Sequence, residues 1–318
     1  MGRSAARLVL GTRGSGLALW QARHVAGRLV ALHPGIRVEE RIVRTEGDLD
    51  PSPTFGGFGV GVFVRRLEEA LRAREIDLAV HSLKDVPTEM PPDLTLAAVL
   101  ERHDARDALV TVAGQSLAQL EPGTLVGTGS LRRRAQLLRA RPDLHTRPVR
   151  GNIDTRIRKL LEGEFGALLL AVAGIERLAL DRAPWIALPI ETCLPAVGQG
   201  AIAVETRAGE GPTIELLRAL DHAPTHAAVR AERAFLDRLG GGCLAPAAAH
   251  AVIEDGAIRL RAFAGDADGV EALYDEGRGP TDDAESLGRS VAERLLAAGA
   301  GRLLARSRDA SVDEPHGA

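Results

Sequence analysis

Hydrophobic and polar positions in the first 180 residues repeat one pattern: a short apolar run, a glycine-rich turn and an amphipathic stretch. Residues Arg7–Leu10 lead through the turn GTRGSG into Leu17–Leu32, where apolar residues recur at helical spacing. Residues Thr124–Val126 lead in the same way through GTGS into a helix predicted over Leu131–Ala140. The pattern therefore predicts two strand–turn–helix units of one design.

Each unit continues with a helix and then a strand that is apolar on both faces. The helix Val64–Arg72 precedes the strand Ile76–Val80, and the helix Thr155–Leu161 precedes the strand Ala167–Val172. Strands of this kind are typical of parallel sheets that are covered by helices on both sides. We therefore expect two α/β lobes.

Residues after Pro184 are punctuated by proline and glycine, and they end in a predicted strand, Ala201–Glu205. Such a segment is typical of a hinge, so we expect it to return the chain to the first lobe. The first lobe then comprises residues 1–100 and 201–222, and the second comprises residues 101–200.

From about residue 223 the pattern becomes that of a small α+β domain. Asp255 and Gly256 join two alternating stretches, which is a hairpin signal. We expect this domain to span residues 223–307 and residues 308–318 to form a disordered tail. Its predicted elements are a helix over Thr225–Leu239, strands over Ala247–Ile253 and Ala257–Ala264, and a helix over Ala284–Ala297.

The overall charge excludes several classes of function. The chain has 43 acidic and 40 basic residues, and only six Phe, two Trp and one Tyr. A nucleic-acid binder needs a basic excess or aromatic stacking surface. The longest apolar run, Ala167–Ile175, is shorter than the roughly 20 residues of a membrane span, and the N-terminus resembles no signal peptide. We expect a cytoplasmic protein that binds neither nucleic acid nor membrane.

The two cysteines, Cys193 and Cys243, cannot form a disulfide framework and lack the spacing of metal ligands, so we expect no metal. Most cysteines are buried apolar residues. Cys243, however, follows three glycines that offer no side chains to bury it, which favours an accessible thiol. No paired His or Asn is evident, so Cys243 fits an attachment point better than a nucleophile.

Candidate site residues follow the predicted strands, where helix N-termini present free N–H groups to ligands. They are Thr12, Arg13, Ser15, Ser82, Lys84, Asp85, Thr128, Ser130, Arg132, Arg133, Gly174 and Arg177. Many of these residues are cations, although the net charge of the chain is −3. We therefore expect a cleft between the lobes that holds a polyanion.

Two helix starts, Leu131–Arg134 and Arg150–Arg156, carry arginines where the helix dipole disfavours cations unless an anion is present. They favour bidentate binding of carboxylate or phosphate, the alternative being a solvated basic surface. All 40 basic residues except Lys84 and Lys159 are arginine, a bias that a GC-rich genome also produces. Asp85 is either a surface ion pair with Lys84 or an ionised acid that faces a ligand cation or N–H group.

Seven segments and the closing hairpin together resemble the porphobilinogen deaminases, also called hydroxymethylbilane synthases. The segments are GTRGSGLALWQA, DLAVHSLKDVP, VGTGSLRRRAQL, RPVRGNIDTRIRKL, LAVAGIERL, LPAVGQGA and AERAFLDRLGGGC, with the hairpin after them. The likeness covers almost the whole chain at near-constant spacing.

The resemblance implies two α/β lobes like type II periplasmic binding proteins around a cleft, with a small C-terminal α+β domain. It implies a transferase of heme biosynthesis that condenses four porphobilinogen molecules head to tail onto a dipyrromethane cofactor, releasing hydroxymethylbilane and ammonia. The cofactor would be held on Cys243 by a thioether. The growing chain would carry up to twelve carboxylates, which accounts for the arginines. The enzyme would be a monomer whose product passes to uroporphyrinogen III synthase.

The resemblance also implies the role of each site residue. Asp85 is the expected catalytic acid, which contacts pyrrole N–H groups, assists protonation of the leaving amine and stabilises the azafulvene cation. The residues expected to bind cofactor or substrate carboxylates are Arg13, Ser15, Ser82, Lys84, Thr128, Ser130, Arg132, Arg133, Arg150, Arg156, Arg177 and Gln199.

Two positions depart from the family pattern. Val60 stands where the family loop usually has a lysine, and Gly129 replaces a serine in the turn after the strand. The main rival function is a non-catalytic two-lobed binder of small anions. That rival gives no reason for an exposed thiol at Cys243.

Overall fold

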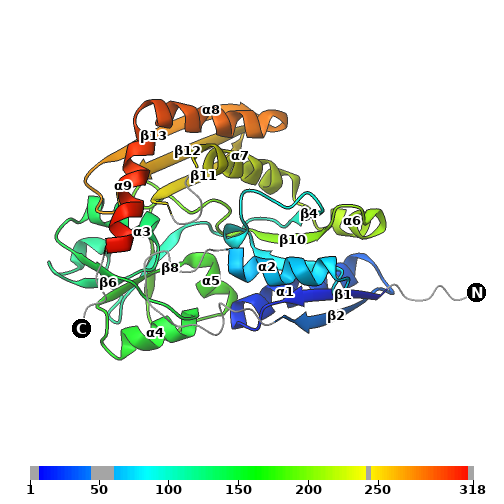
Figure 1. Cartoon of the computed structure of the whole chain (residues 1–318). Coiled ribbons are helices and arrows are strands. Elements are labelled where there is room, and N and C mark those ends of the chain that lie inside the picture. The colour runs from blue at the N-terminus through cyan, green and yellow to red at the C-terminus, as the bar shows by residue number, and fades with distance from the viewer. Residues whose placement is uncertain (1–6, 44–60, 241–244, 314–318) are drawn as a thin grey trace, which may run out of the picture.

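The computed structural model describes residues 7–43, 61–240 and 245–313, which form three sheets with their covering helices (Figure 1). The first sheet has the strand order β2-β1-β3-β10-β4, and two of its helices are α1 and α2. Its strands are β1 (Arg7–Thr12), β2 (Arg37–Ile42), β3 (Leu78–Ser82), β4 (Leu94–Val99) and β10 (Ile202–Arg207). Its helices are α1 (Gly16–Leu32), α2 (Gly61–Arg72), α6 (Gly211–Arg218) and the 3-10 turn η2 (Leu83–Asp85).

The second sheet repeats this plan with the strand order β7-β6-β8-β5-β9. Its strands are β5 (Asp107–Val110), β6 (Leu125–Gly127), β7 (His145–Arg147), β8 (Ala167–Ala171) and β9 (Trp185–Ala187). Its helices are α3 (Leu131–Ala140), α4 (Ile153–Leu161), α5 (Val172–Arg177) and the 3-10 turn η3 (Leu117–Gln119). The expected pair of α/β lobes is therefore confirmed.

Each sheet is mixed rather than wholly parallel. The predicted strands β1 and β3 are parallel neighbours, as are β6 and β8. β10 runs antiparallel to β3 and β4, and β5 runs antiparallel to β8 and β9. The apolar runs are buried as expected, but burial on both faces does not fix strand direction. β10 comes from a segment about 100 residues after β4, and it fills the gap between β3 and β4.

The third sheet belongs to a small α+β unit with the strand order β11-β12-β13. The hairpin at Asp255 and Gly256 is confirmed, and both residues have the positive φ angles that this turn requires. Its elements are α7 (Ala223–Leu239), β11 (Ala247–Glu254), β12 (Ala257–Gly265), β13 (Ala272–Pro280), η4 (Thr281–Asp283), α8 (Ala284–Ala297) and α9 (Ala300–Asp313).

The core of this unit forms where α7 and α8 pack on the sheet, and Phe235 is fully buried in it. The prediction of a disordered tail from residue 308 differs from the structure, in which α9 continues to Asp313. Leu303 and Leu304 are buried and anchor the first half of this helix, so the helix continues beyond the anchored turn. Across the described parts of the chain, no helix is long and apolar enough to cross a membrane.

The third unit contacts both lobes. Arg233 of α7 donates to the carbonyl oxygens of Val86, Pro87 and Thr88, which directly follow η2 in the first lobe. In the second lobe, the turn between β12 and β13 lies against α3, and Arg134 pairs with Asp268 at 2.8 Å. In Figure 1 the third unit lies above both lobes, and α9 descends beside α3.

Candidate active site

Three helix N-termini carry most of the predicted site residues. The side chains of Ser15, Ser130 and Asn152 cap α1, α3 and α4 by accepting hydrogen bonds from backbone N–H groups of the first turn. The positive end of each helix dipole is thus presented beside arginines, an arrangement that favours bound anions. Thr128 is fully buried, and its hydroxyl accepts from the backbone N–H of Ser130 at 3.2 Å, which fixes the turn before α3.

A small pocket in the first lobe contains Asp85. Arg13, Ser15 and Ser82, all predicted site residues, line this pocket together with Asp85. Ser82 exchanges hydrogen bonds with Gln21 of α1 at 2.9 and 3.2 Å, which ties the end of β3 to that helix. The remaining lining residues are Leu17, Ala18, Gln21, Val64, Val80 and His81.

Charged residues of both lobes interact electrostatically around Asp85, and we call them the charged cluster. Desolvation lowers the pKa of Lys84 to about 8, and the positive charge of Arg133 adds to this effect while Asp85 opposes it. Desolvation also lowers the pKa of Arg156 to about 10, again with a contribution from Arg133. The members of the charged cluster are Lys84, Asp85, Asp107, Arg132, Arg133, Arg150 and Arg156.

Five cations of the charged cluster therefore surround two carboxylates. Each lowered pKa records the cost of holding a cation away from water beside other cations. A ligand with several carboxylates would relieve that cost, because each carboxylate would pair with a cation that already lies in place. The donor set thus fits a polycarboxylate such as dipyrromethane.

Asp107, at the start of β5, is the buried anchor of the two predicted arginines. Its Oδ2 accepts from Nη1 of Arg132 at 2.7 Å, and its Oδ1 accepts from Nε and Nη2 of Arg133 at 2.9 and 2.7 Å. Burial alone would raise the pKa of Asp107, but the charges of Arg132 and Arg133 outweigh it and hold that pKa far below its usual range. Asp107 is therefore ionised throughout the working pH range.

Gln199 and Arg177 lie where the chain crosses between the lobes. Gln199 donates to Oδ1 of Asp107 at 2.9 Å and to the carbonyl oxygen of Ala105 at 2.6 Å. Arg177 donates to the carbonyl oxygen of Gly200 at 2.6 Å, and its guanidinium lies 5.7 Å from the centre of the Trp20 ring. Desolvation lowers the pKa of Arg177 to about 10. The buried Nε of Arg177 and Oε1 of Gln199 lack hydrogen-bond partners among the described residues.

The structure thus brings the predicted residues together in three neighbouring groups rather than one. Arg13, Ser15 and Ser82 lie in the pocket with Asp85, most of the others lie in the charged cluster, and Gln199 and Arg177 lie at the crossover. Cys243 and Val60 lie outside the described residues. Gly129 lies inside them, in the turn before α3, where an added Cβ would stand 3.4 Å from a backbone oxygen.

Sequence reasoning missed Asp107 and the buried pair of His81 and Glu205, whose Nε2 and Oε2 lie 3.0 Å apart. Asp107 is an acid directly before an apolar strand in RDALV, which is a recognisable signal. Its partners are distant in the sequence, so the signal alone could not assign them. Glu205 lies in a similarly apolar run and is fully buried.

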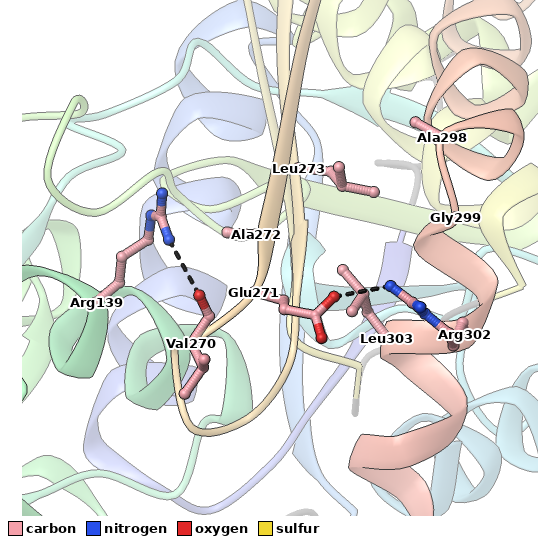
Figure 2. A pocket seen from close by; sticks show the side chains of 9 residues that line it. All are labelled: Arg139, Val270, Glu271, Ala272, Leu273, Ala298, Gly299, Arg302 and Leu303. Carbon is pink, nitrogen blue, oxygen red and sulfur yellow. Dashed lines mark hydrogen bonds and ion pairs between the residues drawn. The ribbon is translucent and has the colours of Figure 1, made fainter.

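A larger cavity of about 280 Å³ lies elsewhere, against α9 and the start of β13. Figure 2 shows its polar side chains turned toward neighbours: Arg302 pairs with Glu271 at 2.8 Å, and Arg139 points to the carbonyl oxygen of Val270. None of the predicted site residues that the structure describes lines this cavity. Within residues 7–43, 61–240 and 245–313, no group of three potential metal ligands occurs.

Comparison with known proteins assigns the chain to a protein family. The family model described as "Porphobilinogen deaminase, dipyromethane cofactor binding domain" matches residues 8–215, and "Porphobilinogen deaminase, C-terminal domain" matches residues 226–297. Porphobilinogen deaminase of Desulforudis audaxviator (strain MP104C) is 48% identical over 302 residues, which cover 95% of this chain and 98% of that protein.

The porphobilinogen deaminase of Syntrophotalea carbinolica (strain DSM 2380 / NBRC 103641 / GraBd1) is 47% identical over 305 residues, which cover 95% of this chain and 96% of that protein. Among solved structures, full-length BenM has a TM-score of 0.41 at 15% identity, covering 68% of this chain and 66% of that one. The two family matches, together with 48% identity to the Desulforudis audaxviator protein over 95% of the chain, show that this protein belongs to the porphobilinogen deaminase family.

Proposed function

We propose that this protein is a hydroxymethylbilane synthase, which deaminates four porphobilinogen molecules and condenses them head to tail on a dipyrromethane cofactor. The observation that carries this proposal is the charged cluster, in which cations from both lobes surround Asp85. Each pyrrole unit carries two carboxylates. A site with this surplus of cations suits a chain whose negative charge grows with every addition.

The residues that would hold the cofactor and the growing chain are those of the charged cluster and the pocket. Arg132 and Arg133 donate hydrogen bonds to the buried Asp107. Arg150 and Arg156 lie on either side of the capped start of α4. Guanidinium groups held in this way can pair with carboxylates without first losing side-chain freedom. When bound, the dipyrromethane supplies the free pyrrole α-carbon to which each new unit is added.

Asp85 would act as the catalytic acid of the reaction. Lys84 and Arg156 both interact electrostatically with Asp85, so its carboxylate lies among the cations that would bind ligand carboxylates. An ionised carboxylate can accept hydrogen bonds from pyrrole N–H groups and stabilise the positive charge that develops as ammonia leaves. Asp85 lies in the pocket with Arg13 and Ser82. In its protonated form, the same carboxyl group can donate a proton to the departing amine as a general acid.

We further propose that Cys243 holds the cofactor through a thioether. The helix α7 ends at Leu239, four residues before this cysteine, and Arg233 of that helix binds the segment after Asp85. The attachment point therefore follows a helix that is tied to the reacting region. We also propose that the enzyme acts as a cytoplasmic monomer whose product passes to uroporphyrinogen III synthase.

Intact-protein mass spectrometry of the purified enzyme tests this function. We expect one covalent adduct equivalent to two condensed pyrroles, absent from a Cys243→Ser variant. Incubation with porphobilinogen should release four molecules of ammonia for each linear tetrapyrrole. A wild-type protein with neither adduct nor product would contradict the proposal.

The role of Asp85 is tested separately with Asp85→Ala. This variant should fold normally, since Asp85 lies half-buried in a short 3-10 turn, and it should lose nearly all turnover. Glu89→Ala, which removes an exposed carboxylate four residues away, is the matched control and should retain activity. Near-normal product formation by Asp85→Ala would refute the assigned role.

A further inference from the structure

Asp107 contacts three of the predicted binding residues. Its two carboxylate oxygens accept hydrogen bonds from the consecutive Arg132 and Arg133 of α3 and from Gln199. The thiol of Cys193 donates to Oδ2 at 3.2 Å. Asp107 itself is fully buried, so it cannot contact a substrate directly.

The remaining contacts of the two arginines complete this arrangement. Arg132 also donates to the carbonyl oxygen of Leu194 at 2.6 Å, and Arg133 donates to that of Leu169 at 2.9 Å. Arg132 binds both acceptors through one nitrogen, Nη1, whereas Arg133 donates to Asp107 from Nε and Nη2 and to the carbonyl from Nη1. These contacts restrict rotation of the planar guanidinium groups and thereby direct their remaining N–H bonds.

We propose that Asp107 is a positioning residue that fixes Arg132 and Arg133 in the orientation that binds ligand carboxylates. This inference rests on the proposed function, because it assumes that the two arginines bind carboxylates of the cofactor or the growing chain. Asp107 acts through the arginines and contacts neither substrate nor cofactor. It also joins them to Gln199, so one buried carboxylate aligns side chains of α3 with the crossover between the lobes.

An alternative role for Asp107, the neutralisation of excess positive charge, predicts the opposite change in carboxylate binding. If Asp107 only neutralised excess positive charge, its removal would leave the arginines more attractive to carboxylates. If Asp107 positions them, its removal weakens carboxylate binding even though the net positive charge increases. A purely structural role would lower the melting temperature and leave binding unchanged.

The experiment compares Asp107→Asn with Asp107→Glu in the full-length enzyme. Asp107→Asn removes the charge at nearly constant shape, whereas Asp107→Glu keeps the charge and displaces the carboxylate by one methylene. Positioning predicts that both variants raise KM for porphobilinogen by about tenfold or more, because misplacement by about 1 Å is costly. It also predicts a smaller fraction of purified protein carrying the cofactor, measured by intact mass.

Asp107→Asn leaves two buried guanidinium groups without their carboxylate, which strongly destabilises a fold. If this variant does not fold, Asp107→Glu still decides between the roles, because a charge-neutralising residue predicts normal KM and cofactor content for it. Asp143→Asn is the matched control, since Asp143 pairs with Arg141 at 2.6 Å on the surface of the same lobe. That control should leave both readouts unchanged.

The outcomes separate this inference from the proposed function. A wild-type enzyme that carries the adduct and forms product, together with Asp107 variants of normal KM and normal cofactor content, overturns the positioning role alone. A lower KM for Asp107→Asn overturns it in favour of charge neutralisation. A wild-type enzyme without adduct or product overturns the proposed function itself.

Discussion

Lys84 is one of two lysines in an arginine-rich chain, and its surroundings make its charge sensitive to pH. Desolvation and the nearby charge of Arg133 lower its pKa to about 8, whereas arginines in the same cluster remain charged well above that pH. A binding site that needs every cation would gain from an arginine here. Lys84 therefore introduces a pH dependence that the neighbouring arginines do not have.

We predict that kcat/KM for porphobilinogen falls about tenfold per pH unit well above pH 8, because deprotonated Lys84 no longer attracts carboxylates. Lys84→Arg should remove this decline, because a guanidinium stays charged over this pH range. The measurement is the pH profile of kcat/KM from pH 7 to pH 9.5 for both proteins, in which titration of the substrate is common to both. Identical profiles would show that Lys84 does not control the decline.

The contribution of Lys84 to stability has the opposite dependence on pH. An ordinary lysine has a pKa of 10.5, so the unfolded chain binds this proton more tightly than the folded one. Between about pH 8 and 10.5 the contribution of Lys84 to the free energy of unfolding therefore increases with pH. Carboxylate binding decreases over the same range.

At the scale of the elements, the capped helix N-termini organise the site, and α4 is the clearest case. The side chain of Asn152 accepts from the backbone N–H of Thr155 at 2.8 Å, and Arg156 donates from Nε to the carbonyl oxygen of Gly151. The cap and the arginine thus hold the same turn. Removal of the Asn152 cap should therefore also displace the guanidinium of Arg156.

We predict that Asn152→Ala lowers the free energy of unfolding by about 1 kcal/mol and raises KM severalfold. Asn152→Asp, which keeps the capping oxygen, should retain most of the stability. Thermal denaturation and steady-state kinetics measure the two effects. Ser116→Ala is the control, because it removes the hydrogen bond from Oγ of Ser116 to Oε1 of Gln119 at the start of η3, where no predicted site residue lies. An unchanged KM for Asn152→Ala would show that the helix cap does not affect substrate binding.

The sequence predicts elements well where local signals are strong, and it predicts their pairing poorly. The bounds of α3 and α8 agree with the prediction, since Ser130 caps the first and Pro142 follows it. β13 escaped prediction because its residues, ALYDEGRGP, alternate in exposure on an edge strand and lack a continuous apolar run. Strand direction in both lobes depends on partners far along the chain, which no local pattern reveals.

The candidate site was predictable to a similar extent. Glycine turns and helix starts identify Arg13, Ser130 and Arg156 from local sequence. Asp107 could not be assigned in this way, because its partners Arg132 and Gln199 come from segments about 25 and 90 residues away. Its role depends on the fold that brings them together.

At the scale of the whole molecule, the third unit connects the two lobes through different contacts. Arg233 binds three successive carbonyls after Asp85 in the first lobe. Gly269 lies so close to α3 of the second lobe that a Cβ would stand 2.4 Å from the carbonyl oxygen of Ala135. The third unit therefore contacts both the segment after Asp85 and helix α3, the two regions that carry site residues.

We predict that Arg233→Gln lowers kcat by about tenfold, because the segment after Asp85 loses its supports, while cofactor content stays near normal. Arg238→Gln is the control on the same helix, since Arg238 pairs with Glu293 at 3.1 Å on the surface of the third unit. Single-turnover kinetics and intact mass provide the two readouts. A normal kcat for Arg233→Gln would show that the segment is held by its own prolines.

We predict that Gly269→Ala destabilises the enzyme by roughly 1–3 kcal/mol more than Gly256→Ala. Both glycines have φ near +75°, so the backbone strain of the two substitutions is similar. Only Gly269 has neighbours within reach of an added Cβ, and Gly256 has none within 4 Å. The difference in melting temperature thus measures the docking of the turn on α3. Equal melting temperatures for the two variants would show that the turn between β12 and β13 shifts to accommodate the added Cβ without loss of stability.

The insertion of β10 between β3 and β4 also determines the order in which the chain can fold during synthesis. The strands of the second lobe lie within residues 107–187 and can pair as soon as they leave the ribosome. The first lobe is made earlier, but β3 and β4 have no partner on their facing edges until Ile202–Arg207 arrives. The lobe synthesised first is thus completed last, and its open edges are the part of the nascent protein most exposed to aggregation.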